Sequence, residues 1–278
     1  MRTILNVLKK NSFYFFVAGA FALSSCGGNQ ENKQTNAVDS LAQANEQAIQ
    51  EAETIIKSFP TPFQLTKMLN DAGASYILDV SNPVESAEKY TTVKSKALNW
   101  GIYGADLCYA ATYNKKQETT KYLVATQKLT EKLEIANAVD KSMQEKLEEN
   151  FKSKDSLINM FTKQFAGTYE KLNESGRSNI ATISIAGATI EGLFISTQLA
   201  AFAAKNDELK KVIAGQKDVL KKLGALLGLY KDNEDIQEIA LKIKDINAIF
   251  DNVAETLTDE QLKNLSTKIE SIRNEYIK

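Results

Sequence analysis

The segment "IATISIAGATIEGLFISTQLAAFAA", residues 180–204, decides the class of fold. It is apolar nearly all round, and Glu191 is its only charged residue. A helix that is hydrophobic on every side is buried in a protein core or lies in a membrane. Because the segment is much longer than a typical β-strand of about 5–6 residues, we expect a central helix surrounded by other helices.

A second segment has the same character. "ALNWGIYGADLCYAATYN", residues 97–114, is apolar around its whole circumference and contains one charged residue, Asp106. Glycine lowers helix stability by about 1 kcal/mol relative to alanine, so glycines in such helices indicate that helix backbones approach closely. The two predicted central helices carry four of them: Gly101, Gly104, Gly187 and Gly192.

The starts of several helices are marked by capping signals. A capping box pairs Thr61 with Gln64 and Thr258 with Gln261, because each side chain can bond to the other residue's backbone N–H. "NPVE", residues 82–85, has the same pattern and predicts another helix start.

Amphipathic segments with a charged face fill most of the remaining chain. A first helix is expected near Leu41, and Gly73 and Gly176 are expected to end helices. The fold class is therefore all-α, either an antiparallel helical bundle or stacked helical hairpins. The predicted helices after the last proline are 92–114, 115–135, 137–152, 154–174, 178–204, 207–230, 234–255 and 258–277.

Residues 180–204 are also long enough to cross a membrane, which needs about 20 apolar residues. The segment lacks a flanking tryptophan belt, and the amphipathic helices on both sides need an apolar partner. We therefore predict a core helix, and a soluble domain over residues 41–278. Polar residues within the segment support this prediction: Thr182, Ser184, Thr189, Ser196, Thr197 and Gln198.

The first 25 residues have the organisation of a bacterial secretion signal. Arg2, Lys9 and Lys10 are basic, and residues 13–23 form an apolar run within the roughly 7–15 residues of a signal peptide. The sequence Leu-Ser-Ser-Cys that ends at Cys26 resembles the lipobox of bacterial lipoproteins. An ordinary cleaved signal and an uncleaved anchor are the alternatives.

The lipobox resemblance implies a lipid anchor at Cys26. In lipoproteins the signal is cut before the cysteine, whose thiol receives a diacylglycerol, and the new amino terminus is acylated. Residues 26–40 would then be the lipidated cysteine and a flexible tether, and 41–278 a single helical domain. Glu31 is the only acid close after the cysteine, so we expect an outer-membrane protein that faces the periplasm rather than the cell surface.

Composition argues against several functions. Without residues 1–25 the chain has 31 basic and 35 acidic residues, so its charge does not favour nucleic-acid binding. Histidine, the commonest general base and metal ligand, is absent, and we expect no metal or other cofactor. Cys108 is expected to be a small core residue.

Asp106 and Glu191 are the candidate functional residues, because an unpaired carboxylate is costly to bury. Each acid must either have a partner or face a cavity. If it has a partner, we expect a tyrosine or a lysine. A polar site between the two central helices would also contain Tyr103, Tyr109 and Tyr113, which lie on the same helix as Asp106. Its role is either structural or ligand binding.

Residues 95–114 and 185–197 are similar to a group of uncharacterised helical lipoproteins of Bacteroidota. This resemblance implies an all-helical domain and no known activity. We therefore expect a non-catalytic interaction or structural module anchored to the outer membrane, with envelope proteins as its partners. The alternative function is small-ligand binding between helices 97–114 and 180–204.

Overall fold

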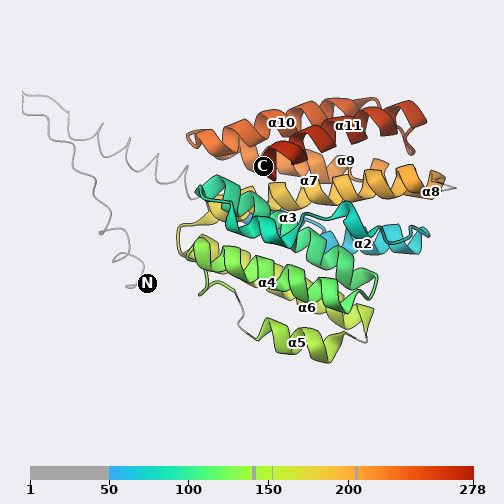
Figure 1. Ribbon diagram of the computed structural model, residues 1–278. Coiled ribbons are helices and arrows are strands. Elements are labelled where there is room, and N and C mark those ends of the chain that lie inside the picture. The colour runs from blue at the N-terminus through green and yellow to red at the C-terminus, as the bar shows by residue number, and fades with distance from the viewer. Residues whose placement is uncertain (1–49, 140–141, 152, 204–205) are drawn as a thin grey trace, which may run out of the picture. The chain divides into compact units, whose positions relative to one another are not determined.

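The computed structural model describes residues 50–139, 142–151, 153–203 and 206–278. They belong to a compact unit that extends from Gln47 to Lys278. The predicted signal peptide, the tether and the start of the first helix lie outside the described residues, as does Cys26. Within the described residues the fold is all-α, as predicted, and contains no strand (Figure 1).

The predicted helices correspond closely to the observed ones. A first helix covers residues 50–57, and two short 3-10 helices, η2 (Leu78–Val80) and η3 (Val84–Glu88), lie between α2 and α3. The longer helices are α2 (Pro62–Asp71), α3 (Val93–Thr112), α4 (Lys116–Lys132), α5 (Met143–Asn150), α6 (Lys154–Glu174), α7 (Ser178–Phe202), α8 (Asp207–Ala214), α9 (Lys217–Gly228), α10 (Glu234–Asp251) and α11 (Asp259–Tyr276).

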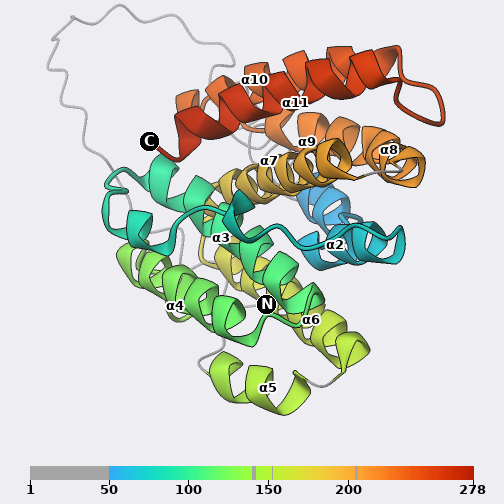
Figure 2. The same ribbon diagram turned by 45° about the vertical axis from the view of Figure 1, so that its right-hand side comes forward.

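The two apolar helices, α3 and α7, lie at the centre of the bundle. Helices α4 and α6 pack on one side of this pair, with α5 outside them against α6, and α9, α10 and α11 lie on the other side (Figure 1 and Figure 2). Nineteen of the 25 residues of α7 are buried. The expectation of two central helices is therefore confirmed.

Two of the four glycines allow α3 and α7 to touch through their backbones. A Cβ atom at Gly101 would lie 1.9 Å from Ser184 O, and one at Gly187 would lie 2.1 Å from Leu98 O. Both distances are far shorter than the contacts that non-bonded atoms make in proteins. A side chain at either position would therefore force the helices apart. The expected close approach is thus confirmed at Gly101 and Gly187.

The other two glycines do not bring helix backbones together. A Cβ atom at Gly192 would lie 3.1 Å from a side-chain carbon of Leu65 in α2, and one at Gly104 would have no neighbour within 4 Å. The expectation was therefore wrong for Gly192, which meets a side chain of α2, and for Gly104, which borders open space.

Several helix ends follow local sequence signals. Both predicted capping boxes form, at Thr61 with Gln64 and at Thr258 with Gln261. Gly73 and Gly176 have φ values of 88° and 72°, a left-handed conformation that glycine adopts without steric cost.

Three predicted boundaries were wrong. "NPVE" does not start an α-helix, because the Asn82 side chain bonds to Tyr90 and Asn99 instead of capping, and a 3-10 helix follows. The segment 207–230 divides into α8 and α9 at Gly215, where glycine weakens the helix. The helix predicted over 137–152 begins only at Met143, since turns occupy the residues after α4.

Helix α7 is long and apolar enough to cross a membrane by length and composition alone. However, 94% of its most apolar window is buried inside the bundle. Surrounding helices therefore already cover the surface that lipid would cover, as expected for a core helix.

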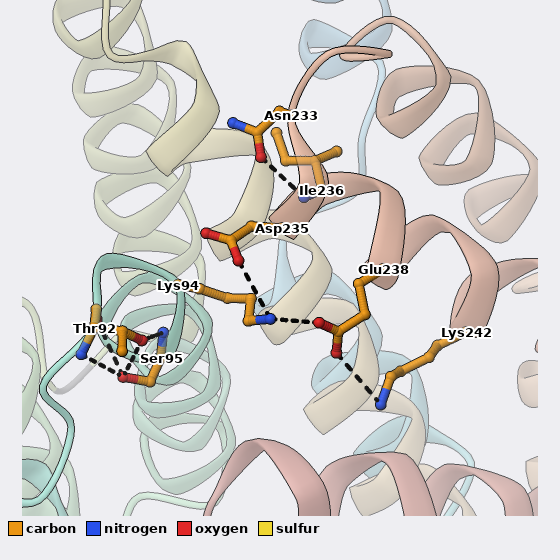
Figure 3. A network of polar contacts seen from close by, with 8 residues as sticks. All are labelled: Thr92, Lys94, Ser95, Asn233, Asp235, Ile236, Glu238 and Lys242. Atoms are coloured by element: carbon orange, nitrogen blue, oxygen red, sulfur yellow. Dashed lines mark hydrogen bonds and ion pairs between the residues drawn. The ribbon is translucent and has the colours of Figure 1, made fainter.

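Exposed ion pairs connect the starts of α3 and α10 (Figure 3). Lys94 Nζ lies 3.3 Å from Asp235 Oδ1 and 2.6 Å from Glu238 Oε2, and Glu238 also pairs with Lys242. Each helix start is capped separately, α3 by Thr92 and α10 by Asn233. Exposed pairs contribute about 0–1 kcal/mol each, so these pairs add little to the stability of the fold.

The two glycines of α3 give a direct test of the central contact. We expect Gly101→Ala to destabilise the protein by about 3 kcal/mol, because its methyl group overlaps the α7 backbone. Gly104→Ala should instead stabilise it by up to about 1 kcal/mol, since the methyl group meets open space and alanine favours the helix. Urea unfolding followed by circular dichroism measures both values, and equal effects of the two changes would contradict the proposed contact.

Candidate functional site

The three predicted site tyrosines lie on one face of α3 and hold the segment between α2 and α3. That segment, residues 73–92, carries η2 and η3 and runs beside α3. Each tyrosine hydroxyl group forms a hydrogen bond with a main-chain atom of residues 73–92, so the tyrosines hold this segment against α3. Tyr103 Oη donates to Pro83 O (2.7 Å), Tyr109 Oη accepts from Ile77 N–H (2.8 Å), and Tyr113 Oη donates to Ala74 O (2.9 Å).

Asp106 lies on the same face of α3 and is completely buried. Its Oδ2 accepts a hydrogen bond from the Asn82 N–H at 3.1 Å, whereas its Oδ1 has no hydrogen-bond partner among the described residues. Burial raises the pKa of Asp106 well above its ordinary value, and the Glu191 carboxylate raises it further, while Arg273 opposes both effects. The neutral carboxylic acid is therefore favoured at this position.

Glu191, the acid of α7, forms a buried ion pair with Arg273 of α11. Arg273 Nε lies 2.7 Å from Glu191 Oε2, and Arg273 Nη2 lies 2.8 Å from Oε1, with the two side chains 7% and 0% exposed. The guanidinium group also donates to Val80 O at 3.3 Å and stacks 4.2 Å from the Phe194 ring centre. Two parallel bonds of this kind fit an arginine and not a lysine.

The expectation that Glu191 has a partner was right, but the type of partner was wrong. A tyrosine or lysine was expected, and the partner is Arg273. One signal in the sequence could have indicated it. Arg273 directly follows Ile272 on the apolar face of α11, where a strongly basic side chain is unusual unless it is paired.

Two buried asparagines extend this cluster: Asn82, which the sequence indicated only as a helix cap, and Asn99, which it did not single out. Asn82 Nδ2 donates to Tyr90 Oη at 3.0 Å and lies 3.3 Å from Asn99 Oδ1, while Asn99 Nδ2 donates to Tyr276 O at 2.8 Å. The network thus joins residues 73–92, α3 and the end of α11. Buried polar groups of this kind specify one arrangement, since any other leaves them unpaired.

The cluster is a structural element and not an open site. The five predicted residues are brought together around residues 73–92, but none of them lines the cavities described below. Within the described part of the chain there is also no group of three or more Cys, Asp or Glu residues that could hold a metal ion.

The opposite face of α3 borders a cavity of about 390 Å³ between α3, α4, α6 and α7. Trp100, Gly104, Leu107 and Cys108 line it from α3, and their spacing places them on one helical face. Gly104 borders the cavity, which explains why a Cβ atom there would meet nothing within 4 Å. The other walls are mostly apolar, with Leu123, Phe161, Phe165, Leu172, Ala181 and Ile185 among them.

A second cavity of about 200 Å³ lies beside the first, between helix 50–57, α2, α6, α7 and α9. Phe165, Tyr169 and Ile185 line both cavities. Thr162 also lines the second cavity. Its hydroxyl group and that of Tyr169 are buried and make no hydrogen bond within the described residues. Such groups cost about 1–3 kcal/mol each.

Cys108 is buried, as predicted, and forms part of the cavity wall. Burial raises the pKa of its thiol to about 12. Burial therefore disfavours the thiolate, which is the reactive form of cysteine.

Comparison of the chain with protein-family models, curated proteins and solved structures finds no match. Its function must therefore be inferred from its own geometry.

The buried ion pair gives a test of the polar cluster. We expect Glu191→Leu alone to destabilise the protein by about 3–5 kcal/mol, because it leaves Arg273 buried without a counter-charge. Adding Arg273→Met should restore most of this loss, since an apolar pair can replace a buried ion pair. Unfolding free energies of the two single variants and the double variant measure the coupling, and additive losses would show that the two side chains act independently.

Proposed function

We propose that this protein is a non-catalytic lipoprotein of the cell envelope whose helical domain holds a small apolar ligand. The observation that carries the proposal is the cavity of about 390 Å³ between α3, α4, α6 and α7. Ligand sites are typically clefts or cavities of about 300–1,000 Å³ with mostly apolar walls.

The cavity supports the second of the two functions expected from the sequence, small-ligand binding. Packed helices leave few gaps larger than a water molecule between them, whereas this hollow is far larger and opens partly to solvent. Here Gly104 leaves space where an alanine or a larger residue would fit. The ligand site we propose lies between both central helices but on the face of α3 opposite Asp106, so it does not contain the residues indicated by the sequence.

The non-catalytic part of the proposal rests on how the reactive groups are used. Asp106 and Glu191 hold the fold together through Asn82 and Arg273, and the Cys108 thiol is kept protonated by burial. The remaining polar side chains around the cavity are mainly hydroxyl and amide groups, such as Thr126 and Gln164. These groups orient a ligand and do not activate it.

The envelope location rests on the lipobox-like sequence at Cys26. We expect Cys26→Ser to abolish labelling by a fatty-acid analogue in the native host and to block normal processing, because serine does not accept the diacylglycerol. Gel fluorescence after metabolic labelling measures this, with Cys108→Ser as the matched control that retains the label. Labelling of the Cys26 variant would contradict the anchor.

Filling the cavity tests the proposed ligand site. The chain over residues 27–278 contains the whole compact unit, and we expect it to bind the neutral apolar dye N-phenyl-1-naphthylamine. Gly104→Leu should weaken this binding at least about tenfold, because the side chain occupies the cavity.

Gly228→Leu is the matched control. A Cβ atom at Gly228 would also have no neighbour within 4 Å, but Gly228 lies at the end of α9 and does not line the cavity. We expect this variant to bind the dye as the unaltered chain does. Equal binding by both variants and the unaltered chain would place the dye elsewhere and contradict the proposal.

A further inference from the structure

A surface depression adjoins the cavity and carries two basic side chains. Its volume is about 470 Å³, and Lys163 and Lys171 of α6 line it. Both lysines are exposed, and neither forms an ion pair with another described residue. Ala136, Val139, Gln164 and Thr168 line both the depression and the cavity.

The shared residues make the depression and the cavity neighbours along α6. Gln164 directly follows Lys163, and Thr168 lies one turn before Lys171. A molecule in the cavity that extends past Gln164 and Thr168 therefore reaches the two ammonium groups. An apolar interior beside a polar surface region matches a molecule with an apolar chain and a charged end.

We propose that the ligand is a single-chain amphiphile with a carboxylate end, of the fatty-acid class. Its hydrocarbon chain lies in the cavity between α3, α4, α6 and α7, and its carboxylate lies in the depression between Lys163 and Lys171. This inference rests on the proposed ligand-binding function and adds the chemical class of the ligand.

Charge supports an anionic end. The chain as a whole has slightly more acidic than basic residues, and many of its lysines pair with carboxylates, as Lys94, Lys132 and Lys268 do. The two lysines at the depression have no such pairing with a described carboxylate, so their ammonium groups are available to an anionic end of a ligand. Glu131 lines the cavity from α4, so the carboxylate lies toward the α6 side, away from this acid.

Two ligands of equal chain length distinguish the contribution of the head group to affinity from that of the hydrocarbon chain. Dodecanoate and dodecanol are titrated into the chain over residues 27–278 and displace N-phenyl-1-naphthylamine. We expect Lys163→Gln with Lys171→Gln to weaken dodecanoate about fivefold, as two exposed charge pairs would, and to leave dodecanol unchanged. Raising the ionic strength to about 1 M should remove this difference, because salt screens exposed charges.

Lys221→Gln with Lys263→Gln is the matched control, because these lysines are exposed and line neither the cavity nor the depression. It makes the same change in net charge and should alter neither affinity. Unchanged dodecanoate binding in the Lys163 and Lys171 variant, or an equal loss for both ligands, would overturn the carboxylate assignment. If the unaltered chain binds neither the dye nor either ligand, the proposed ligand-binding function itself is wrong.

Discussion

The direct contact between the backbones of α3 and α7 is the constraint on which the rest of the structure depends. Gly101 and Gly187 each lie against main-chain atoms of the other helix, and this is possible only where both positions lack a side chain. The two helices therefore form one unit at the centre of the bundle. The surrounding amphipathic helices cover it with their apolar faces, which accounts for the burial of most of α7.

The close approach also brings the two central acids into one electrostatic environment. Burying two ionised carboxylates without counter-charges would cost much free energy. The two acids avoid this cost in different ways. Glu191 is paired by Arg273, whereas burial favours the neutral form of Asp106, which accepts a hydrogen bond from Asn82. Residues 73–92 are held by this cluster and by the tyrosines of α3, so a segment with little regular structure becomes part of the core.

Helix α3 thus has two faces with different uses. The face with Tyr103, Asp106, Tyr109 and Tyr113 makes hydrogen bonds to residues 73–92 through all four side chains. The opposite face, around Gly104, leaves a cavity that the core does not fill. This division supports the proposed binding function, because the polar cluster keeps the helix in place while the other face stays open to a ligand.

The sequence alone determined the fold class, the two central helices and many helix ends, because these follow from local patterns. Apolar residues around a whole helix predict burial, and capping boxes such as Thr61 with Gln64 are completed within four residues. The sequence also predicted that Asp106 and Glu191 need partners, since burial of an acid always carries that requirement. It could not name those partners or place the cavity. Arg273 lies 82 residues from Glu191, and only the packing of α11 against α7 brings them together. Gly101 and Gly104 are three positions apart and chemically identical, yet one meets a helix backbone and the other open space. That difference depends on which neighbouring helix faces each position, and tertiary packing alone decides it.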